Sequence, residues 1–138
     1  MLTRRTLLGA LVGLAALAAP AMAGDSDPLF VNLTTDDPHR ALMGVGFAQK
    51  QQERGHPVTI FFNDRGVHVA SAKHAETFAE HHKIIAAILE KGGDILVCPM
   101  CMKHFGIAEG DLVAGAVVGS PERTGAALFR DNGKTLTW

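Results

Sequence analysis

The chain reads Ile95-Leu96-Val97-Cys98-Pro99-Met100-Cys101 over the stretch that decides its fold. The apolar run before Cys98 predicts a buried strand. Because proline suits the first position of a helix, we expect a helix to begin directly after that strand. Both cysteines would then lie at a strand-to-helix turn, named here the cysteine turn (residues 98–101). Unpaired backbone N–H groups and the positive end of a helix dipole favour a thiolate at such a turn.

The rest of the chain alternates strand and helix patterns. Strands are expected at residues 29–33, 58–62, 95–97, 113–118 and 134–138, and helices at residues 39–54, 72–91 and 121–130 and directly after Cys98. Strands that alternate with helices in this way predict a mainly parallel sheet with helices on both faces. The fold class is therefore α/β, a small three-layer Rossmann-like domain with a mainly parallel five-stranded sheet. Gly44 and Gly46 lie inside a helical pattern, where small residues would allow the helix to pack closely on the sheet.

The first residues, 1–23, have the pattern of a cleaved export signal. Arg4 and Arg5 form a short basic head, and residues 7–19 form an apolar stretch too short to span a bilayer comfortably. Residues 21–23 read Ala-Met-Ala, which matches an A-x-A cleavage site. Export of the protein to the periplasm is therefore expected.

Cleavage after Ala23 would leave residues 24–138 as a single domain. The string Thr-Arg-Arg-Thr-Leu-Leu at residues 3–8 also resembles a twin-arginine signal, which would export the protein already folded. An uncleaved membrane anchor is the alternative, and Pro20 with the small residues after it favours processing instead.

Charge and size exclude some classes of partner. The chain has 138 residues and a formal net charge of −1, so it carries no strongly basic surface for nucleic acid or anionic lipid. We expect no nucleic-acid partner and no membrane contact after processing. A nucleotide-binding function is also disfavoured, because the chain has neither a G-x-G-x-x-G motif at a turn nor a P-loop motif.

The C-x-x-C spacing points to chemistry at the cysteines. Closing a disulfide between residues this near in sequence removes little loop entropy, so a stabilising disulfide explains the spacing poorly. Redox, sulfur or metal chemistry explains it better. The remaining structural alternative is a pair of ordinary buried cysteines.

Polar residues follow the expected strands at their carboxyl ends. Thr35 and Asp36 follow the first strand, Asn63 and Asp64 follow the second, and Cys98 follows the third. Because reactive groups and ligands gather at this edge of a parallel sheet, these residues can form one pocket. The alternative for either aspartate is that it only caps a turn.

The histidines and one lysine extend this hypothesis. His68 and Lys73 follow the second strand and are expected to supply positive charge near the cysteine turn, where they would hold an anionic sulfur donor. His74, His81 and His82 lie in the second helical region. Each of these three is individually expected to be a solvated surface residue, because helices tolerate histidine on polar faces.

Four features of the sequence support a family resemblance. They are the Phe-Phe-Asn-Asp-Arg-Gly-Val segment at residues 61–67, the cysteine turn, Gly106, and the closing Lys-Thr-Leu-Thr-Trp at residues 134–138. With these features the chain resembles the DsrE/DsrF-like family, which includes the YchN-like proteins and sulfur-relay subunits. In the relay subunits a cysteine that matches Cys98 carries a persulfide, and the YchN-like members also have a cysteine that matches Cys101. The resemblance implies a small α/β domain that assembles into homotrimers or homohexamers.

One feature departs from the family pattern. The best-known relay subunits are cytoplasmic, whereas this chain carries an export signal, so a role in modifying transfer RNA is not expected. We expect a sulfur-relay or thiol-redox protein, with Cys98 as the nucleophile and Cys101 as the resolving thiol. No cofactor is expected. The partners would be sulfur donor and acceptor proteins or small thiols.

Two other functions stay open at this point. Cys98, Cys101, Met102 and His104 offer the soft ligands that Cu(I) prefers, although a structural zinc site lacks a second ligand pair. A non-catalytic oligomeric subunit is the other alternative, with residues 113–118 and Trp138 as contacts between copies.

Overall fold

The computed structural model describes residues 24–138, so the expected export signal at residues 1–23 lies outside the described residues. The strands are β1 (Leu29–Leu33), β2 (Val58–Phe62), β3 (Asp94–Val97), β4 (Val117–Val118) and β5 (Lys134–Thr137). The α-helices are α1 (Pro38–Glu53), α2 (Ala75–Glu90), α3 (Pro99–Phe105) and α4 (Pro121–Leu128). Three short 3-10 helices complete the order: η1 (Asp64–His68), η2 (Ala72–His74) and η3 (Glu109–Asp111).

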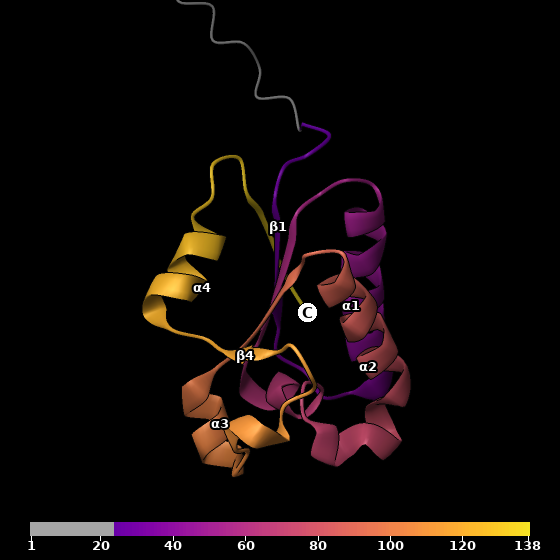
Figure 1. The fold of residues 1–138 in the computed structure, drawn as a ribbon, viewed down its shortest axis with the longest axis vertical. Helices are drawn as coiled ribbons and strands as arrows, with labels where there is room; N and C mark the ends of the chain where they lie inside the picture. The colour runs from indigo at the N-terminus through magenta and orange to yellow at the C-terminus, as the bar shows by residue number, and fades with distance from the viewer. Residues whose placement is uncertain (1–23) are drawn as a thin grey trace, which may run out of the picture.

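The five strands form one sheet in the order β4-β3-β2-β1-β5, and every neighbouring pair is parallel. Helices α1 and α2 cover one face of this sheet and α4 lies on the other, as Figure 1 shows. The expected α/β fold with a mainly parallel five-stranded sheet is therefore confirmed. Because the strands run in one direction, their carboxyl ends share the edge where α3 and η1 lie, at the bottom of Figure 1.

The main core lies between the sheet and the pair α1 and α2. Alternate strand residues face these helices, and Val31, Ile60 and Val97 are fully buried there. Burying an aliphatic side chain of this size stabilises the fold by about 1.5–3 kcal/mol. The core therefore fixes the direction in which each strand delivers the residue after its carboxyl end.

Glycine allows α1 to approach the sheet at one of the two expected positions. A Cβ atom on Gly44 would lie 2.9 Å from Cδ1 of Leu33 and 3.1 Å from Cγ of Trp138, so a larger residue would force a neighbouring side chain to shift. A Cβ atom on Gly46 would have nothing within 4 Å, so close packing does not explain that residue.

The strand expected at residues 113–118 is much shorter in the structure. Only Val117 and Val118 pair with β3. Residues 113–116 do not extend this strand. Val113 donates its N–H to the Ala70 carbonyl at 2.9 Å, and Gly115 turns the chain with a φ of +87°. The apolar run at residues 113–118 thus serves a loop contact and a turn as well as a strand.

The expectation of a solvated surface position is wrong for His81. Its side chain is only 3% exposed, and its Nε2 lies 2.9 Å from the Pro38 carbonyl. His82 is half-buried, with Nε2 at 2.9 Å from the Val69 carbonyl, and burial lowers the pKa of its imidazole. The spacing contained the signal for His81, because it stands three residues after Phe78 and four before Ile85, both buried.

None of the helices in residues 24–138 combines the length and apolarity that a membrane crossing needs.

Candidate functional site

The cysteine turn forms at the carboxyl end of β3. Cys98 is the N-cap residue of α3, with extended backbone angles of φ −67° and ψ 117°, and Pro99 follows at the start of the helix. The backbone N–H of Cys98 donates to the Phe62 carbonyl of β2 at 2.9 Å, and its carbonyl accepts from Met102 N–H at 2.9 Å. The strand-to-helix turn expected from the sequence is confirmed, and the sheet holds the Cys98 backbone in place.

Both cysteines are free thiols and both are half-buried. The Cys101 Sγ atom accepts a hydrogen bond from the backbone N–H of Asp64 at 3.1 Å. Burial raises the pKa of Cys101, the neighbouring Cys98 side chain raises it further, and the Asp64 N–H acts in the opposite direction. Burial and the second thiol thus outweigh the effect expected of the turn, and Cys101 keeps its proton at neutral pH.

The segment that supplies this N–H is η1, which packs tightly on the end of β1. Asn63 N–H donates to the Leu33 carbonyl at 3.0 Å, and Gly66 N–H lies 3.2 Å from the Thr34 carbonyl. A Cβ atom on Gly66 would lie only 2.2 Å from the Leu33 carbonyl oxygen, so glycine is required there. Asp64 itself has a φ of +47°, a left-handed conformation that non-glycine residues seldom adopt. This backbone arrangement aims the Asp64 N–H at Cys101.

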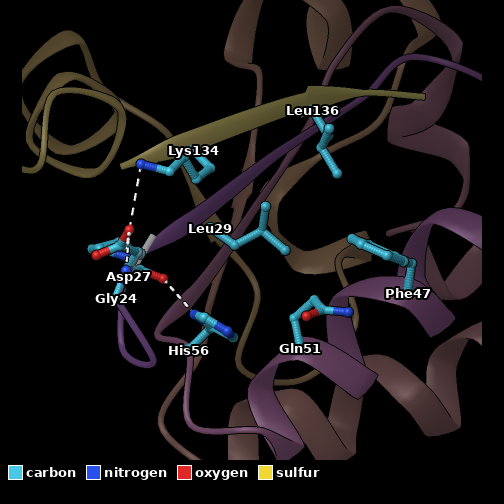
Figure 2. A pocket seen from close by; sticks show the side chains of 9 residues that line it. Gly24, Asp27, Leu29, Phe47, Gln51, His56, Lys134 and Leu136 are labelled. Atoms are coloured by element: carbon cyan, nitrogen blue, oxygen red, sulfur yellow. Dashed lines mark hydrogen bonds and ion pairs between the residues drawn. The ribbon is translucent and has the colours of Figure 1, made fainter. Parts of the chain in front are cut away.

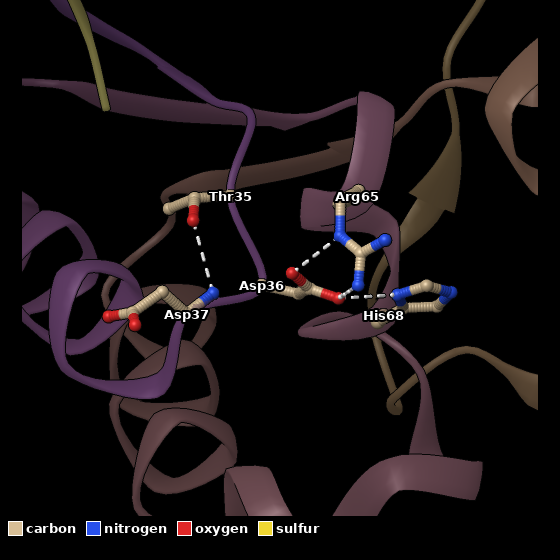
Figure 3. Close-up of polar contacts among 5 residues, drawn as sticks. All are labelled: Thr35, Asp36, Asp37, Arg65 and His68. Carbon is tan, nitrogen blue, oxygen red and sulfur yellow. Dashed lines mark hydrogen bonds and ion pairs between the residues drawn. The ribbon is translucent and has the colours of Figure 1, made fainter.

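A charged cluster ties the loop after β1, which carries Asp36, to η1, as Figure 3 shows. The Asp36 carboxylate accepts a hydrogen bond from Arg65 Nε at 2.8 Å, and a second ion-pair contact joins it to Arg65 Nη2, also at 2.8 Å. His68 Nδ1 lies 3.1 Å from the same carboxylate. Arg65 and then His68 hold the pKa of Asp36 below its ordinary value in spite of partial burial. Asp36 in turn raises the pKa of Arg65.

The cluster also reaches the helix that carries Cys101. The His68 ring meets the Phe105 ring edge-on, with 4.6 Å between centroids, and Phe105 is the last residue of α3. The His74 ring also meets the His68 ring edge-on, with 4.9 Å between centroids. The cluster of Asp36, Arg65 and His68 therefore joins the loop after β1 to η1 and contacts α3 through Phe105.

The remaining pocket residues expected from the sequence have other contacts. Lys73 Nζ forms an ion pair with Asp111 at 2.7 Å, and Thr35 Oγ1 accepts from the Asp37 N–H at 3.0 Å. The Asn63 side chain donates to Asn32 Oδ1, and Asp64 contributes its backbone N–H, not its carboxylate, to Cys101. The structure thus brings Asp36 and His68 together, with Asp64 linked through η1.

Arg65 was not among the residues singled out from the sequence. Its side chain is the principal partner of Asp36 although the two residues are far apart in sequence. The only signal was its place in the family segment at residues 61–67, because no local pattern predicts a pairing across two strands.

The alternative metal ligands do not converge. Met102 is 5% exposed and lies in the hydrophobic core, whereas His104 is exposed and meets the Phe105 ring edge-on, with 4.7 Å between centroids. Within residues 24–138 no group of three or more His, Cys, Asp or Glu side chains is arranged to hold a metal ion. The burial of Met102 disfavours a shared coordination site at the cysteine turn.

A cavity of about 210 Å³ lies at the opposite edge of the sheet (Figure 2). It is lined by Gly24, Asp27, Pro28, Leu29, Phe47, Gln51, His56, Lys134 and Leu136. These residues lie at the amino ends of β1 and β5 and on α1 and its following loop. The cavity is therefore separate from the cysteine turn.

The fold and the site together define a class of protein: a parallel α/β domain with two free thiols at the carboxyl edge of its sheet. The DsrE/DsrF-like family matches residues 28–132, which is most of the described chain. The chain belongs to the DsrE/DsrF-like family.

Two solved structures have a similar fold. A protein of unknown function from Methanobacterium thermoautotrophicum, MTH1491, has a TM-score of 0.68 at 15% identity, over 82% of this chain and 100% of that one. A conserved protein of unknown function from Bacteroides thetaiotaomicron, BT1422, has a TM-score of 0.59 at 20% identity, over 81% of this chain and 95% of that one. At these identities the likeness concerns the fold. No curated protein matches the chain.

Proposed function

We propose that this protein is a periplasmic sulfur-relay or thiol-redox protein that accepts sulfane sulfur as a persulfide on Cys98, with Cys101 as the resolving thiol. The observation that carries the proposal is the pair itself, two free, half-buried thiols one helical turn apart at the carboxyl edge of the sheet. Family membership supports a sulfur-relay type of function. The expected export signal supports a place outside the cytoplasm.

The loading step is a thiol exchange at sulfur. The Cys98 thiolate attacks the outer sulfur of a persulfide R–S–SH, the S–S bond of the donor breaks, and R–S⁻ leaves. With thiosulfate as donor, sulfite is the leaving group. In each case Cys98 ends with one added sulfur atom, and no external oxidant or reductant is consumed.

The persulfide then has two outcomes. An acceptor thiolate can attack the outer sulfur, which transfers that sulfur and returns Cys98 as a thiolate. Alternatively, a Cys101 thiolate attacks the inner sulfur, a Cys98–Cys101 disulfide forms, and HS⁻ leaves. In this second outcome the added sulfur is reduced to sulfide while the cysteine pair is oxidised, so an external dithiol must reduce the disulfide before the next cycle.

The raised pKa of Cys101 supports this division of roles. A resolving thiol that keeps its proton at neutral pH does not compete with Cys98 for the donor. It also releases sulfide slowly, because only its thiolate attacks. A bound persulfide therefore has time to reach an acceptor.

Intact mass spectrometry tests the proposal. The reduced protein is exposed to thiosulfate or polysulfide, with Cys98→Ser and Cys101→Ser variants in parallel. We expect a gain of one sulfur that dithiothreitol removes, in the wild type and in Cys101→Ser but not in Cys98→Ser. No gain, together with a metal ion retained in the native mass spectrum, would support soft-metal binding instead. No gain and no metal would favour a non-catalytic subunit.

A further inference from the structure

We propose that Asp36 is a positioning residue for Cys101. It holds η1 against the loop that follows β1, so that the Asp64 N–H stays directed at the Cys101 sulfur. This inference rests on the proposed function, because it assigns a residue to the reactivity of the resolving thiol. It goes beyond that function by naming a side chain that contacts neither sulfur.

A single short helix, η1, connects Asp36 to Cys101. Asp36 binds two residues of η1, Arg65 at 2.8 Å and His68 at 3.1 Å. The first residue of the same short helix is Asp64, whose N–H lies 3.1 Å from the Cys101 Sγ atom. One five-residue element therefore joins the carboxylate to the sulfur.

The backbone of η1 is strained at its first residue. Asp64 keeps a positive φ of +47°, a conformation that costs a non-glycine residue free energy and persists only where its surroundings enforce it. The Asp36 contacts lie on Arg65 and His68, directly after this position. Loss of the carboxylate charge should let η1 relax and weaken the bond from the Asp64 N–H to Cys101.

The cluster also contacts α3 through His68. His68 meets Phe105 at 4.6 Å, and Phe105 ends the helix that carries Cys101. The same group of side chains therefore holds both the donor segment and the helix of the acceptor sulfur.

The charged and titratable groups around these atoms are few in the described chain. Asp36 faces Arg65 and His68, and His68 also faces His74. Cys101 faces Cys98 and Asp64. The charges of these neighbours contribute to the pH at which Cys101 titrates.

The effect of charge alone has the opposite sign to the effect of positioning. Removing the negative charge of Asp36 would favour the Cys101 thiolate through space and lower its pKa. Weakening the Asp64 N–H contact would remove a bond that favours the thiolate and raise that pKa. The Asp36→Asn variant therefore separates the two explanations by the direction of the shift.

The test uses the full chain in a Cys98→Ser background, where Cys101 is the only thiol. The rate of alkylation by iodoacetamide is measured by mass spectrometry from neutral to strongly alkaline pH. Asp36→Asn should raise the midpoint of the rate profile by about half a pH unit, because a charge-assisted hydrogen bond is partly lost. Alkylation below the midpoint should then be about threefold slower. Asp27→Asn, a matched change at the opposite edge of the sheet, should leave it in place. An unchanged or lowered midpoint in Asp36→Asn would overturn the inference.

A second variant decides the case if Asp36→Asn does not fold. Arg65 is exposed, with 61% of its side-chain surface accessible, so Arg65→Lys should fold while it loses the Nε contact and keeps the charge. If Asp36 acts by positioning η1, the Cys101 midpoint should rise in Arg65→Lys. If only charge matters, the midpoint should not shift. Sulfur loading is measured separately on Cys98 in the wild-type background, so failure of loading would overturn the proposed function without moving the Cys101 midpoint.

Discussion

The two cysteines have different surroundings although they lie on one helical turn. Cys98 follows β3 directly, and its backbone groups bond to β2 and α3. Cys101 packs against the core, and its sulfur accepts the N–H of Asp64. A nucleophile needs a fixed position at an accessible edge. A resolving thiol should react only after the nucleophile has taken up the sulfur. These surroundings suit the roles proposed for the two residues.

Sulfide release should depend on pH in a direction that the Cys101 environment sets. Because the pKa of Cys101 is raised, its thiolate is scarce at neutral pH and becomes the major form only in the alkaline range above the ordinary thiol value. In single-turnover reactions of persulfidated protein, sulfide formation should accelerate with rising pH, about tenfold for each pH unit below the pKa. The measurement is sulfide trapped by a fluorogenic reagent.

The Cys101→Ser variant is the control for this reaction. It should retain the persulfide at every pH and release little sulfide without an added thiol, because serine cannot complete the disulfide. Sulfide release that is as fast in Cys101→Ser as in the wild type would show that Cys101 does not resolve the persulfide.

At the scale of elements, the sequence predicted what local patterns control. The apolar runs of β1, β2 and β3 are bounded by turn residues, so their positions follow from periodicity. The cysteine turn also follows from local chemistry, since proline and glycine mark the two ends of α3. The parallel order placed Asp36, Asp64 and Cys98 at one edge before any contact was known.

Contacts between distant segments could not be predicted in this way. The pairing of Asp36 with Arg65 depends on how η1 folds back on β1, and Lys73 pairs with Asp111 across a loop. The short β4 has the same origin, because Val113 bonds to Ala70 instead of β3. Each of these outcomes is set by tertiary partners that hydrophobic periodicity does not contain.

Two glycines should respond oppositely to the same substitution. Gly66→Ala would place a Cβ atom 2.2 Å from the Leu33 carbonyl oxygen and should cost about 1–3 kcal/mol in the free energy of unfolding. Gly46→Ala is the matched control, because nothing lies within 4 Å of its Cβ position in α1 and alanine favours a helix by about 1 kcal/mol. Urea unfolding followed by circular dichroism measures both. Equal changes in the two variants would contradict the packing of η1 on β1.

At the scale of the whole molecule, one surface has the character of a contact between copies. Met43, Phe47 and Leu136 are 44%, 37% and 37% exposed, and Trp138 lies beside Phe47 with 5.6 Å between ring centroids. Leu136 lies in β5 and Trp138 directly follows it. In the described chain β5 pairs only with β1 and leaves its other edge open. The family resemblance implies homo-oligomers, and an open edge strand beside apolar side chains suits a second copy of this chain.

Light scattering after size exclusion tests this surface. The wild type should have a mass of a trimer or hexamer, and Phe47→Asp should reduce it toward the monomer. Phe129→Asp is the control, because Phe129 is 80% exposed after α4, on the other face of the sheet. A monomeric wild type, or an equal effect of the two variants, would refute the assignment of this surface.

The expected export signal would change the amino end of the domain when it is removed. Cleavage after Ala23 would make Gly24 the first residue, and Gly24 N already lies 3.0 Å from Asp27 Oδ2, which also pairs with Lys134 at 3.3 Å. The new α-ammonium group would therefore form within hydrogen-bond distance of the Asp27 carboxylate. Periplasmic protein should have the mass of residues 24–138, whereas a retained leader on the exported protein would contradict cleavage.

Replacing Arg4 and Arg5 by lysine keeps the basic head, so lost export would identify the twin-arginine route and unchanged export the general secretory route.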